Sequence, residues 1–390
     1  MRIPAWLPLL LGFLTAVGPA SIDMYLPAFP AIEAGLHAPA GAAQYTLAAW
    51  FAGLAVGQLM QGTLADRFGR RRPLIVAFAI YTLSCVGCAL APSILVLSGA
   101  RIVGALAASA GMVIPRAMVR DVADGHAAAA MLSRLMLVMG AAPILAPSIG
   151  GLVLMFADWR GIFWVMAAYG AIALVLVLTL LPDTLAPAGR LRLDLSEQVA
   201  RAASILRERG FVTHAAMGGA GIFAFFAYLG GSSPVFIQGF GFSPSGFGLL
   251  FGLCAMGLIG MSQANARLLP RFGHSRLLRV GSLVYLAAAL ALVAVAFAGV
   301  HALGAVFLPM FVMVSLQGLF NPNTTVGALS RHGAHAGTAS ALMGTGQFLL
   351  GAISGLLVGV FTDGTPRGMA ALMLLGAVGV VTADRLRPAR

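Results

Sequence analysis

Long apolar runs separated by short polar loops extend along this 390-residue chain. Each run is close to the 20 or so residues that a helix needs to cross a bilayer. Six runs come before a more polar stretch and six come after it. They lie near 5–27, 43–64, 73–91, 94–118, 131–156 and 161–181, and then near 211–237, 244–266, 277–299, 302–324, 338–361 and 366–385. The pattern predicts an all-α membrane protein with twelve transmembrane helices.

The composition supports the same class. Hydrophobic residues make up 60% of the chain and charged residues only 9%, whereas a soluble domain carries about 25% charged residues. The 49 glycines and 20 prolines are compatible with membrane helices, because neighbouring helices satisfy the freed backbone groups and small residues allow close packing.

All 24 basic residues are arginines, and their distribution predicts the orientation. They gather at both chain ends and in every second loop. Arg160 and Arg367 are the exceptions in the other loops, and Arg101 lies within an apolar run. The positive-inside rule therefore places both termini in the cytoplasm of a multi-pass protein of the bacterial inner membrane. The basic excess does not predict nucleic-acid binding, because the arginines lie in short loops and are not clustered on one face together with aromatic residues.

The polar stretch divides the chain into two six-helix bundles, 1–181 and 211–390, joined by a cytoplasmic linker at 182–210. Asp194 and Glu197 are placed to cap a short helix in this linker. Its apolar face, which predicts an amphipathic helix on the membrane surface, consists of Leu195, Val199, Ala202 and Leu206.

A weak internal repeat relates the two bundles. Residues 64–69 (LADRFG) align with 268–273 (LLPRFG), and each segment follows the second helix of its half. Transporters built from such repeats hold their substrate between the two units. In the second copy Pro270 replaces the acid Asp66, so we expect no matching acidic gate there.

Several motifs, in their expected order, resemble those of the major facilitator superfamily and in particular its bicyclomycin-resistance (Bcr/CflA) drug exporters. The matching segments are 21–28 (SIDMYLPA), 62–72 (GTLADRFGRRR), 116–121 (RAMVRD), 140–151 (GAAPILAPSIGG), 159–164 (WRGIFW) and 336–340 (AGTAS). The resemblance implies two pseudo-symmetric six-helix bundles and drug:proton antiport out of the cytoplasm, not an enzymatic activity. One departure is at Arg101, where the Arg-x-x-Gln-Gly of proton-coupled members reads Arg101-Ile-Val-Gly104-Ala105.

Asp23 is the one acid that the pattern places deep in the hydrocarbon region, roughly 10 Å from the midplane on the outer side. Such an acid usually faces the bundle interior and is functional. Arg101 lies at nearly the same depth, about 7 Å from the midplane. We therefore predict that Asp23 and Arg101 form a proton-coupling pair. The alternatives are a structural hydrogen bond or a wetted helix end for Asp23, and backbone carbonyls or lipid headgroups for Arg101.

Two segments are predicted to control gating. In the loop motif, Asp66 is expected to accept from a helix N-terminus or from an arginine, Arg116 or Arg120, while Gly62 and Gly69 allow close approach and a turn. Arg70, Arg71 and Arg72 also serve topology. In the fifth helix, a kinked and closely packed face is expected to act as a hinge. The alternative is that this face serves only ordinary helix packing. The predicted gating residues are Gly62, Asp66, Arg67, Gly69, Arg70, Arg120, Pro143, Pro147, Gly150 and Gly151.

A set of amides and aromatic residues inside the runs is predicted to line the substrate cavity, although each could equally serve helix packing. These residues are Tyr25, Tyr45, Trp50, Gln58, Gln61, Phe225, Phe226, Tyr228, Gln238, Gln317, Asn321 and Gln347.

We expect neither a cofactor nor a metal site. His332 and His335 have no further ligands nearby, and a chain without lysine cannot form the phosphate-binding loop G-x-x-x-x-G-K-[ST]. The sequence thus favours a monomeric, proton-coupled exporter of small drug-like molecules. An exporter of an endogenous metabolite, such as an amino acid or sugar, and a non-transporting membrane receptor remain the alternatives.

Overall fold

The computed structural model describes residues 6–123, 125–185, 195–332 and 336–387, and these ranges are all-helical apart from loops and turns. The first half begins with a segment broken into short helices and continues with five long ones. Its elements are α1 (Leu7–Thr15), α2 (Val17–Asp23), η1 (Leu26–Ala28), α3 (Phe29–Gly35), α4 (Ala42–Phe68), α5 (Arg71–Ala89), α6 (Ile94–Val122), α7 (Gly125–Val153) and α8 (Trp159–Thr179).

The second half follows a short helix and has six long segments. These elements are α9 (Leu195–Leu206), α10 (Arg209–Ser233), η3 (Pro234–Gly239), α11 (Pro244–Phe272), α12 (His274–Phe297), α13 (Leu303–Leu329), α14 (Ala336–Phe361) and α15 (Pro366–Leu386). Among the described residues, ten helical segments are long and apolar enough to cross a membrane. The 27-residue α4 and α7, with its apolar stretch Ala141–Val153, complete the twelve predicted spans.

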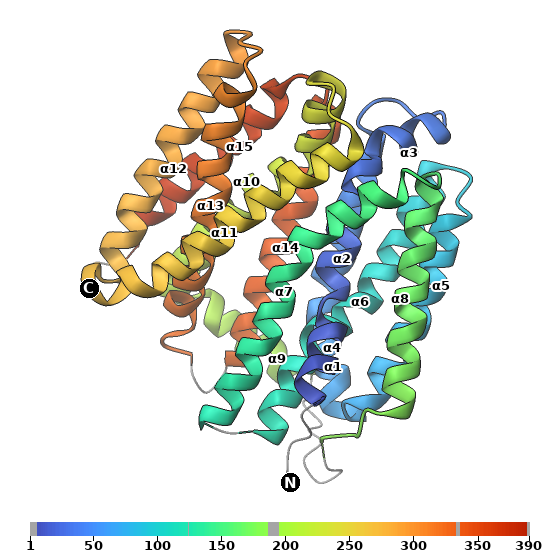
Figure 1. The fold of residues 1–390 in the computed structure, drawn as a ribbon. Coiled ribbons are helices and arrows are strands. Elements are labelled where there is room, and N and C mark those ends of the chain that lie inside the picture. Colours follow the sequence, from blue (N-terminus) through green and yellow to red (C-terminus); the bar gives the residue numbers. More distant parts are fainter. Residues whose placement is uncertain (1–5, 124, 186–194, 333–335, 388–390) are drawn as a thin grey trace.

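The two halves meet along two helix pairs (Figure 1). Within the first half α4 packs on α6 and α5 on α8, and within the second half α10 packs on α13, α14 and α15. Between the halves, α4 packs against α14 and α7 against α11. In Figure 1, α7 and α11 lie close at the end of the molecule that carries α3 and diverge towards the opposite end. We call these the α3 end and the terminal end, because the chain termini lie near the latter.

The first membrane segment is longer and less regular than the predicted run 5–27. It extends to Gly35 and changes direction after Asp23, where Pro27 and Pro30 interrupt regular helical bonding. The following turn is held by Glu33, an 8%-exposed acid whose carboxylate accepts hydrogen bonds from the backbone N–H groups of Gly41 (2.9 Å) and Ala43 (3.1 Å). Glu33 thereby satisfies donors at the start of α4 that no carbonyl of that helix can reach.

Helix starts elsewhere follow local capping chemistry. Ser93, Asp158, Glu208 and Ser243 each accept a hydrogen bond from a backbone N–H in the first turn of the helix that follows. Polar side chains are preferred at this position because they replace the missing carbonyl partners. These caps set the lengths of α6, α8, α10 and α11.

The linker contains the predicted short helix, although its expected cap Asp194 lies outside the described residues. Val199 and Leu206 on α9 are exposed. Ile205 is instead buried with Phe211, Ala328, Ala339 and Met343. The contact that holds α9 to the second half therefore comes from Ile205, which was not part of the predicted apolar face.

Glycines allow the backbones to approach closely at the α3 end. A Cβ added to Gly150 on α7 would lie 1.8 Å from the backbone oxygen of Met24, and one added to Gly151 would lie 2.8 Å from the backbone oxygen of Pro244. The pair therefore contacts the first membrane segment on one side and the second half on the other.

Gly150→Ala should consequently lower the melting temperature in detergent, because the new methyl group overlaps a backbone atom that cannot rotate away. We expect a loss of about 1–3 kcal/mol, the usual cost of overpacking. Gly260→Ala on α11 is the matched control, since no atom lies within 4 Å of its added Cβ, and alanine is the better helix former. Equal melting temperatures for Gly150→Ala and the wild type would contradict this close approach.

Candidate functional site

Arg101 on α6 lies at the centre of a buried cluster in the first half. Its side chain is 1% exposed, and its Nη1 donates a hydrogen bond to the backbone oxygen of Ser21 (2.9 Å). The guanidinium carbon lies 4.0 Å from the ring centroid of Tyr25 and 4.4 Å from that of Trp50. Phe163 on α8 is the third ring, at 6.0 Å. Such ring faces attract a cation, most strongly where water is excluded.

One edge of this guanidinium has no acceptor among the described residues. Both Nε and Nη2 of Arg101 are buried without a hydrogen-bond partner, and so is Nε1 of Trp50. Nε and Nη2 are adjacent donors whose spacing matches the two oxygens of a carboxylate. A buried cation with unmatched donors is costly, so this edge is suited to a further oxygen acceptor.

Asp23 is the last residue of α2 and is only 5% exposed. The predicted ion pair with Arg101 is not formed: the ion pairs of the described residues do not join these two side chains. Asp23 follows Ser21 by two residues, so its side chain leaves the helix roughly 200° about the axis from the side chain of Ser21. Asp23 is instead close enough to the Tyr228 hydroxyl of the second half to interact with it electrostatically.

Aromatic side chains connect the halves near this point. Phe51 on α4 stacks on Phe226 of α10 with ring centroids 3.9 Å apart and an interplanar angle of 13°. Phe348 on α14 is nearly parallel to both. Phe225 lies 5.9 Å from Tyr228, which in turn stacks on Phe251 at 5.4 Å. Phe51, Phe348 and Phe251 were not among the predicted cavity residues, because nothing in an apolar run distinguishes an interface phenylalanine from a lipid-facing one.

The other predicted cavity residues are more scattered. Tyr45 and Gln58 on α4 lie beside Gly359 and Gly344 of α14, where the halves meet. Gln347 lies near Gly218 within the second half, and Asn321 is partly buried on α13.

Three predicted amides serve other roles. Gln61 donates to the backbone oxygen of Leu106 (3.0 Å), so it joins α4 to α6 inside the first half. Gln317 donates to the backbone oxygen of Gly221 (2.7 Å) and to the Tyr285 hydroxyl (2.9 Å) inside the second half. Gln238 is exposed at the α3 end, beside Asp363.

The loop motif forms an ionic cluster at the terminal end. Arg70 is 7% exposed and contacts Asp66 through Nη1 (2.6 Å) and Asp121 through Nε (2.8 Å). Its backbone N–H donates to Asp183 (2.8 Å), and the Thr184 hydroxyl donates to Asp121 (2.9 Å). Burial by itself would lower the pKa of Arg70, but its hydrogen bonds to Asp121 and Asp66 outweigh that effect and raise the pKa. Arg70 therefore stays charged and joins α4, α6 and the segment after α8.

Two details of the predicted loop are corrected. Asp66 pairs with Arg70 on the next turn of the chain, not with Arg116 or Arg120, whose helix presents Asp121 to the cluster instead. Gly62 makes no close approach, since no atom lies within 4 Å of an added Cβ. Gly69 does form the turn, with φ +88°. Arg67 and Arg120 are exposed.

The second half carries a cluster of histidine and amide side chains where the repeat places the equivalent loop. His274 follows Gly273 (φ +72°) as Arg70 follows Gly69. Its Nε2 lies 2.7 Å from the backbone oxygen of Asn323, and the Asn323 amide donates to Asn265 (2.7 Å). Pro270 stands where the first half has the acid Asp66, as the sequence predicts. At this place the second half has an imidazole and two amides, whereas the first half has an arginine and two carboxylates.

In the fifth helix, the prolines occupy the face towards the second half. A Cβ on Gly248 of α11 would lie 3.0 Å from the backbone oxygen of Pro147, and Gly252 faces the backbone of Ile144, next to Pro143. Together with Gly150 and Gly151, this face forms the α7–α11 contact.

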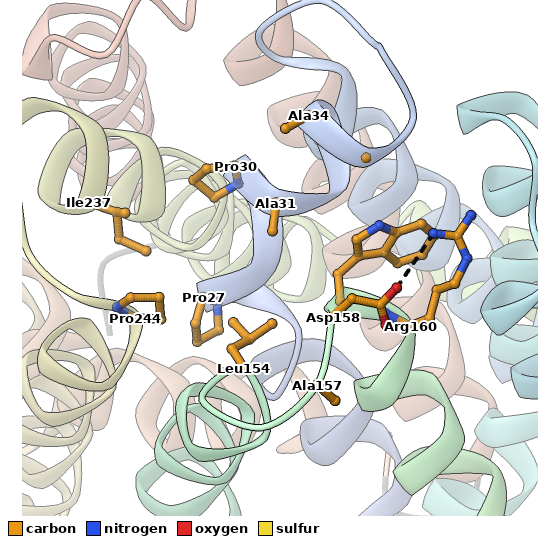
Figure 2. Close-up of a pocket in the computed structure, with 12 residues that line it drawn as sticks. Pro27, Pro30, Ala31, Ala34, Leu154, Ala157, Asp158, Arg160, Ile237 and Pro244 are labelled. Carbon is orange, nitrogen blue, oxygen red and sulfur yellow. Dashed lines mark hydrogen bonds and ion pairs between the residues drawn. The ribbon is translucent and has the colours of Figure 1, made fainter.

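A pocket of about 530 Å³ opens at the α3 end, between the two halves (Figure 2). Pro27, Pro30 and Ala31 come from the first membrane segment, and Ile237 and Pro244 come from the second half. Asp158 and Arg160, 3.8 Å apart, form its polar side. The pocket does not include Asp23 or Arg101, and its lining is mainly apolar.

Among the described residues, no three His, Cys, Asp or Glu side chains are grouped as metal ligands. His332 pairs with Glu208 (2.9 Å), and His335 lies outside the described residues.

Comparisons with known proteins cover nearly the whole chain. The family model of the Major Facilitator Superfamily matches residues 11–356. The chain is 35% identical to the "Uncharacterized MFS-type transporter YdgK" of Bacillus subtilis (strain 168), over 95% of this chain and 92% of that one. It is 30% identical to the "Bicyclomycin resistance protein homolog" of Haemophilus influenzae, over 96% and 93%. The crystal structure of a D-xylose-proton symporter has the same fold, with a TM-score of 0.76 at 18% identity, over 97% of this chain and 95% of that one.

Arg70→Ala should destabilise the first half, because it leaves Asp66 and Asp121 without their shared cation. Removal of one partner from a buried pair typically costs about 3–5 kcal/mol, and we expect the lower end because the Asp66 side chain is 39% exposed. Thermal unfolding in detergent measures the effect. Arg72→Ala, at an exposed position two residues later, is the control. Equal melting temperatures for the two variants would contradict the structural role of Arg70.

Proposed function

Because the chain belongs to the major facilitator superfamily, it is a multi-pass membrane transporter of small molecules and not an enzyme, and we propose that it exports drug-like molecules across the bacterial inner membrane in exchange for protons. The relative named as a bicyclomycin resistance protein homolog supports a drug as the cargo. The observation that carries the proposal is the separation of a buried acid, Asp23, from a guanidinium that is buried inside the first half, Arg101.

The acid and the guanidinium have the properties that proton coupling requires. Asp23 is almost fully buried at a break in its helix, and burial disfavours the charged carboxylate unless a partner compensates. Arg101 offers such a partner through its unmatched Nε–Nη2 edge. An ionised Asp23 that turns towards this edge would form the pair that the sequence predicts, and a protonated Asp23 has no need of it.

Transport then follows because the drug and the proton use the Asp23 carboxylate in turn and never at the same time. In the inward-facing state, drug binds while Asp23 is ionised. After the halves rock, a proton from the outside is transferred to Asp23, the carboxylate loses its charge, and the drug is released. The neutral acid returns and delivers the proton to the cytoplasm. Each cycle moves one proton inward through this one acid.

The polar clusters at the terminal end support the proposed orientation. The turn between α4 and α5, which carries the arginines at 70–72, lies at the end of the molecule where both termini are marked, and the positive-inside rule places this end in the cytoplasm. Arg70, Asp66 and Asp121 then act as the cytoplasmic gate cluster of the first half. The contacts of α7 with α11 form the gate on the outer side. In this proposal the protein works as a monomer, with α9 on the cytoplasmic surface.

Asp23→Asn tests the coupling. Purified protein in liposomes with an imposed pH gradient should export drug, and the variant should lose the response to the gradient by at least ten-fold, because the neutral amide cannot accept a proton. Asp23→Glu keeps a titratable group and should retain part of the activity. The coupling role fails if Asp23→Asn exports drug at the wild-type rate along the same gradient.

Arg101→Lys tests whether the planar guanidinium is needed in addition to its charge. Lysine cannot lie flat between Tyr25 and Trp50 or offer two parallel donors. We expect Arg101→Lys and Arg101→Ala to lose proton-driven export to the same extent. Full export by Arg101→Ala would remove this residue from the mechanism, and full export by Arg101→Lys would show that charge alone suffices.

A further inference from the structure

Ser21, two residues before Asp23, is held by hydrogen bonds to two neighbouring helices. Its backbone oxygen accepts from Nη1 of Arg101 on α6 (2.9 Å), and its hydroxyl lies 2.6 Å from the hydroxyl of Tyr81 on α5. Ser21 is fully buried, and Arg101 and Tyr81 are each 1% exposed. Both bonds therefore form where water is excluded and where a hydrogen bond is electrostatically stronger than in water.

The ring of Tyr81 is confined by its neighbours. A Cβ added to Gly170 on α8 would lie 2.7 Å from Cδ1 of Tyr81, so the ring fills the space that this glycine leaves. Phe78, three residues earlier on α5, meets the ring edge-on, with centroids 6.5 Å apart and an interplanar angle of 81°. The hydroxyl of Tyr81 is thereby fixed by α5 and α8 and acts as an anchor for Ser21.

The anchored residue belongs to the last turn of α2, which ends at Asp23. The last carbonyl groups of a helix lack partners along the chain, and the backbone oxygen of Ser21 finds one in Arg101. Because Ser21 and Asp23 share one helical turn, the Asp23 side chain cannot be carried round the helix axis towards Arg101 unless Ser21 moves as well. The bond between Ser21 and Tyr81 opposes that movement.

We propose that Tyr81 is a positioning residue for Asp23, because its hydrogen bond to Ser21 holds α2 in the geometry that separates Asp23 from Arg101. The inference rests on the proposed export function and adds a residue that regulates its coupling site. Two geometries of α2 are then in equilibrium, one with a neutral Asp23 apart from Arg101 and one with an ionised Asp23 paired with it. The bond to Tyr81 forms only in the first geometry, so by linkage it favours the protonated acid.

The other titratable groups around the end of α2 do not compete with Asp23 for this role. α7 approaches here through Gly150, beside Met24. The remaining neighbours are phenols and thiols, which are uncharged near neutral pH: Tyr25, Tyr81, Cys85, Cys88, Tyr169 and Tyr228. A change of charge at this place near neutral pH is therefore assigned to Asp23.

The experiment follows the tryptophan emission of the purified full-length protein in detergent as the pH is varied. Trp50 lies 4.4 Å from the Arg101 guanidinium, so pairing of Asp23 with Arg101 changes the surroundings of its indole. The pH step that disappears in Asp23→Asn belongs to Asp23. In Tyr81→Phe we expect the midpoint of this step to lie about 0.5–1 pH unit lower than in the wild type, the size that one buried hydrogen bond gives.

Three further variants and a stability measurement keep the test specific. Ser21→Ala removes the same bond but leaves the backbone oxygen to Arg101, so it should lower the midpoint equally, and the double variant should add nothing further. Tyr169→Phe is the matched control, because this buried tyrosine on α8 donates to the backbone oxygen of Phe13 in the same membrane segment, away from Asp23. Its midpoint should equal that of the wild type. The melting temperature of each variant separates a loss of fold from a shift of the midpoint.

The positioning role is refuted if no pH step depends on Asp23, if Tyr81→Phe leaves the midpoint in place or raises it, or if Tyr169→Phe lowers it equally. Proton-driven export is measured separately in liposomes. A shifted midpoint without proton-driven export would refute the proposed function and leave the positioning role standing. Proton-driven export with an unshifted midpoint would do the reverse.

Discussion

The burial of one guanidinium determines how the first half is packed. Lipid offers no hydrogen-bond acceptor to Arg101, so its partners must come from other helices. Ser21 supplies a backbone oxygen, and Tyr25, Trp50 and Phe163 supply ring faces. The break in the first membrane segment, the rotation of α4 and the position of α8 all agree with this one requirement. Two nitrogens of the Arg101 guanidinium have no hydrogen-bond acceptor among the described residues. These unmatched donors connect the packing to the proposed proton coupling.

The two halves share a fold but differ in their polar chemistry. At the terminal end, an arginine between carboxylates holds the first half, whereas the second half combines an imidazole and amides with a buried Arg387–Asp384 ion pair. Among the described residues, the first half also contributes the buried Asp23 and Arg101, whereas the second half faces them with aromatic rings and Tyr228.

Adjacent residues on α4 join these two parts. Trp50 turns towards Arg101 inside the first half, and Phe51 turns towards Phe226 of the second. Successive side chains on a helix point about 100° apart, so one turn of α4 contacts both the charged cluster and the stacked phenylalanine rings of the second half. A rotation or shift of α4 therefore changes both contacts together. This link is a physical route by which the state of Asp23 and Arg101 could be coupled to the separation of the rings.

The sequence by itself determined the twelve spans, the duplication of six helices and the family resemblance, because hydropathy and arginine placement are properties of local composition. It also identified Asp23 and Arg101 as charges deep within membrane runs of the first half. It could not determine which partners these charges contact. The absence of an Asp23–Arg101 pair depends on a rotation of two residues along α2, and the pairing of Arg70 with Asp121 depends on where α6 ends. The stacked rings of Phe51, Phe226 and Phe348 exist only because α4, α10 and α14 meet, and the 23 phenylalanines of the chain look alike in an apolar run.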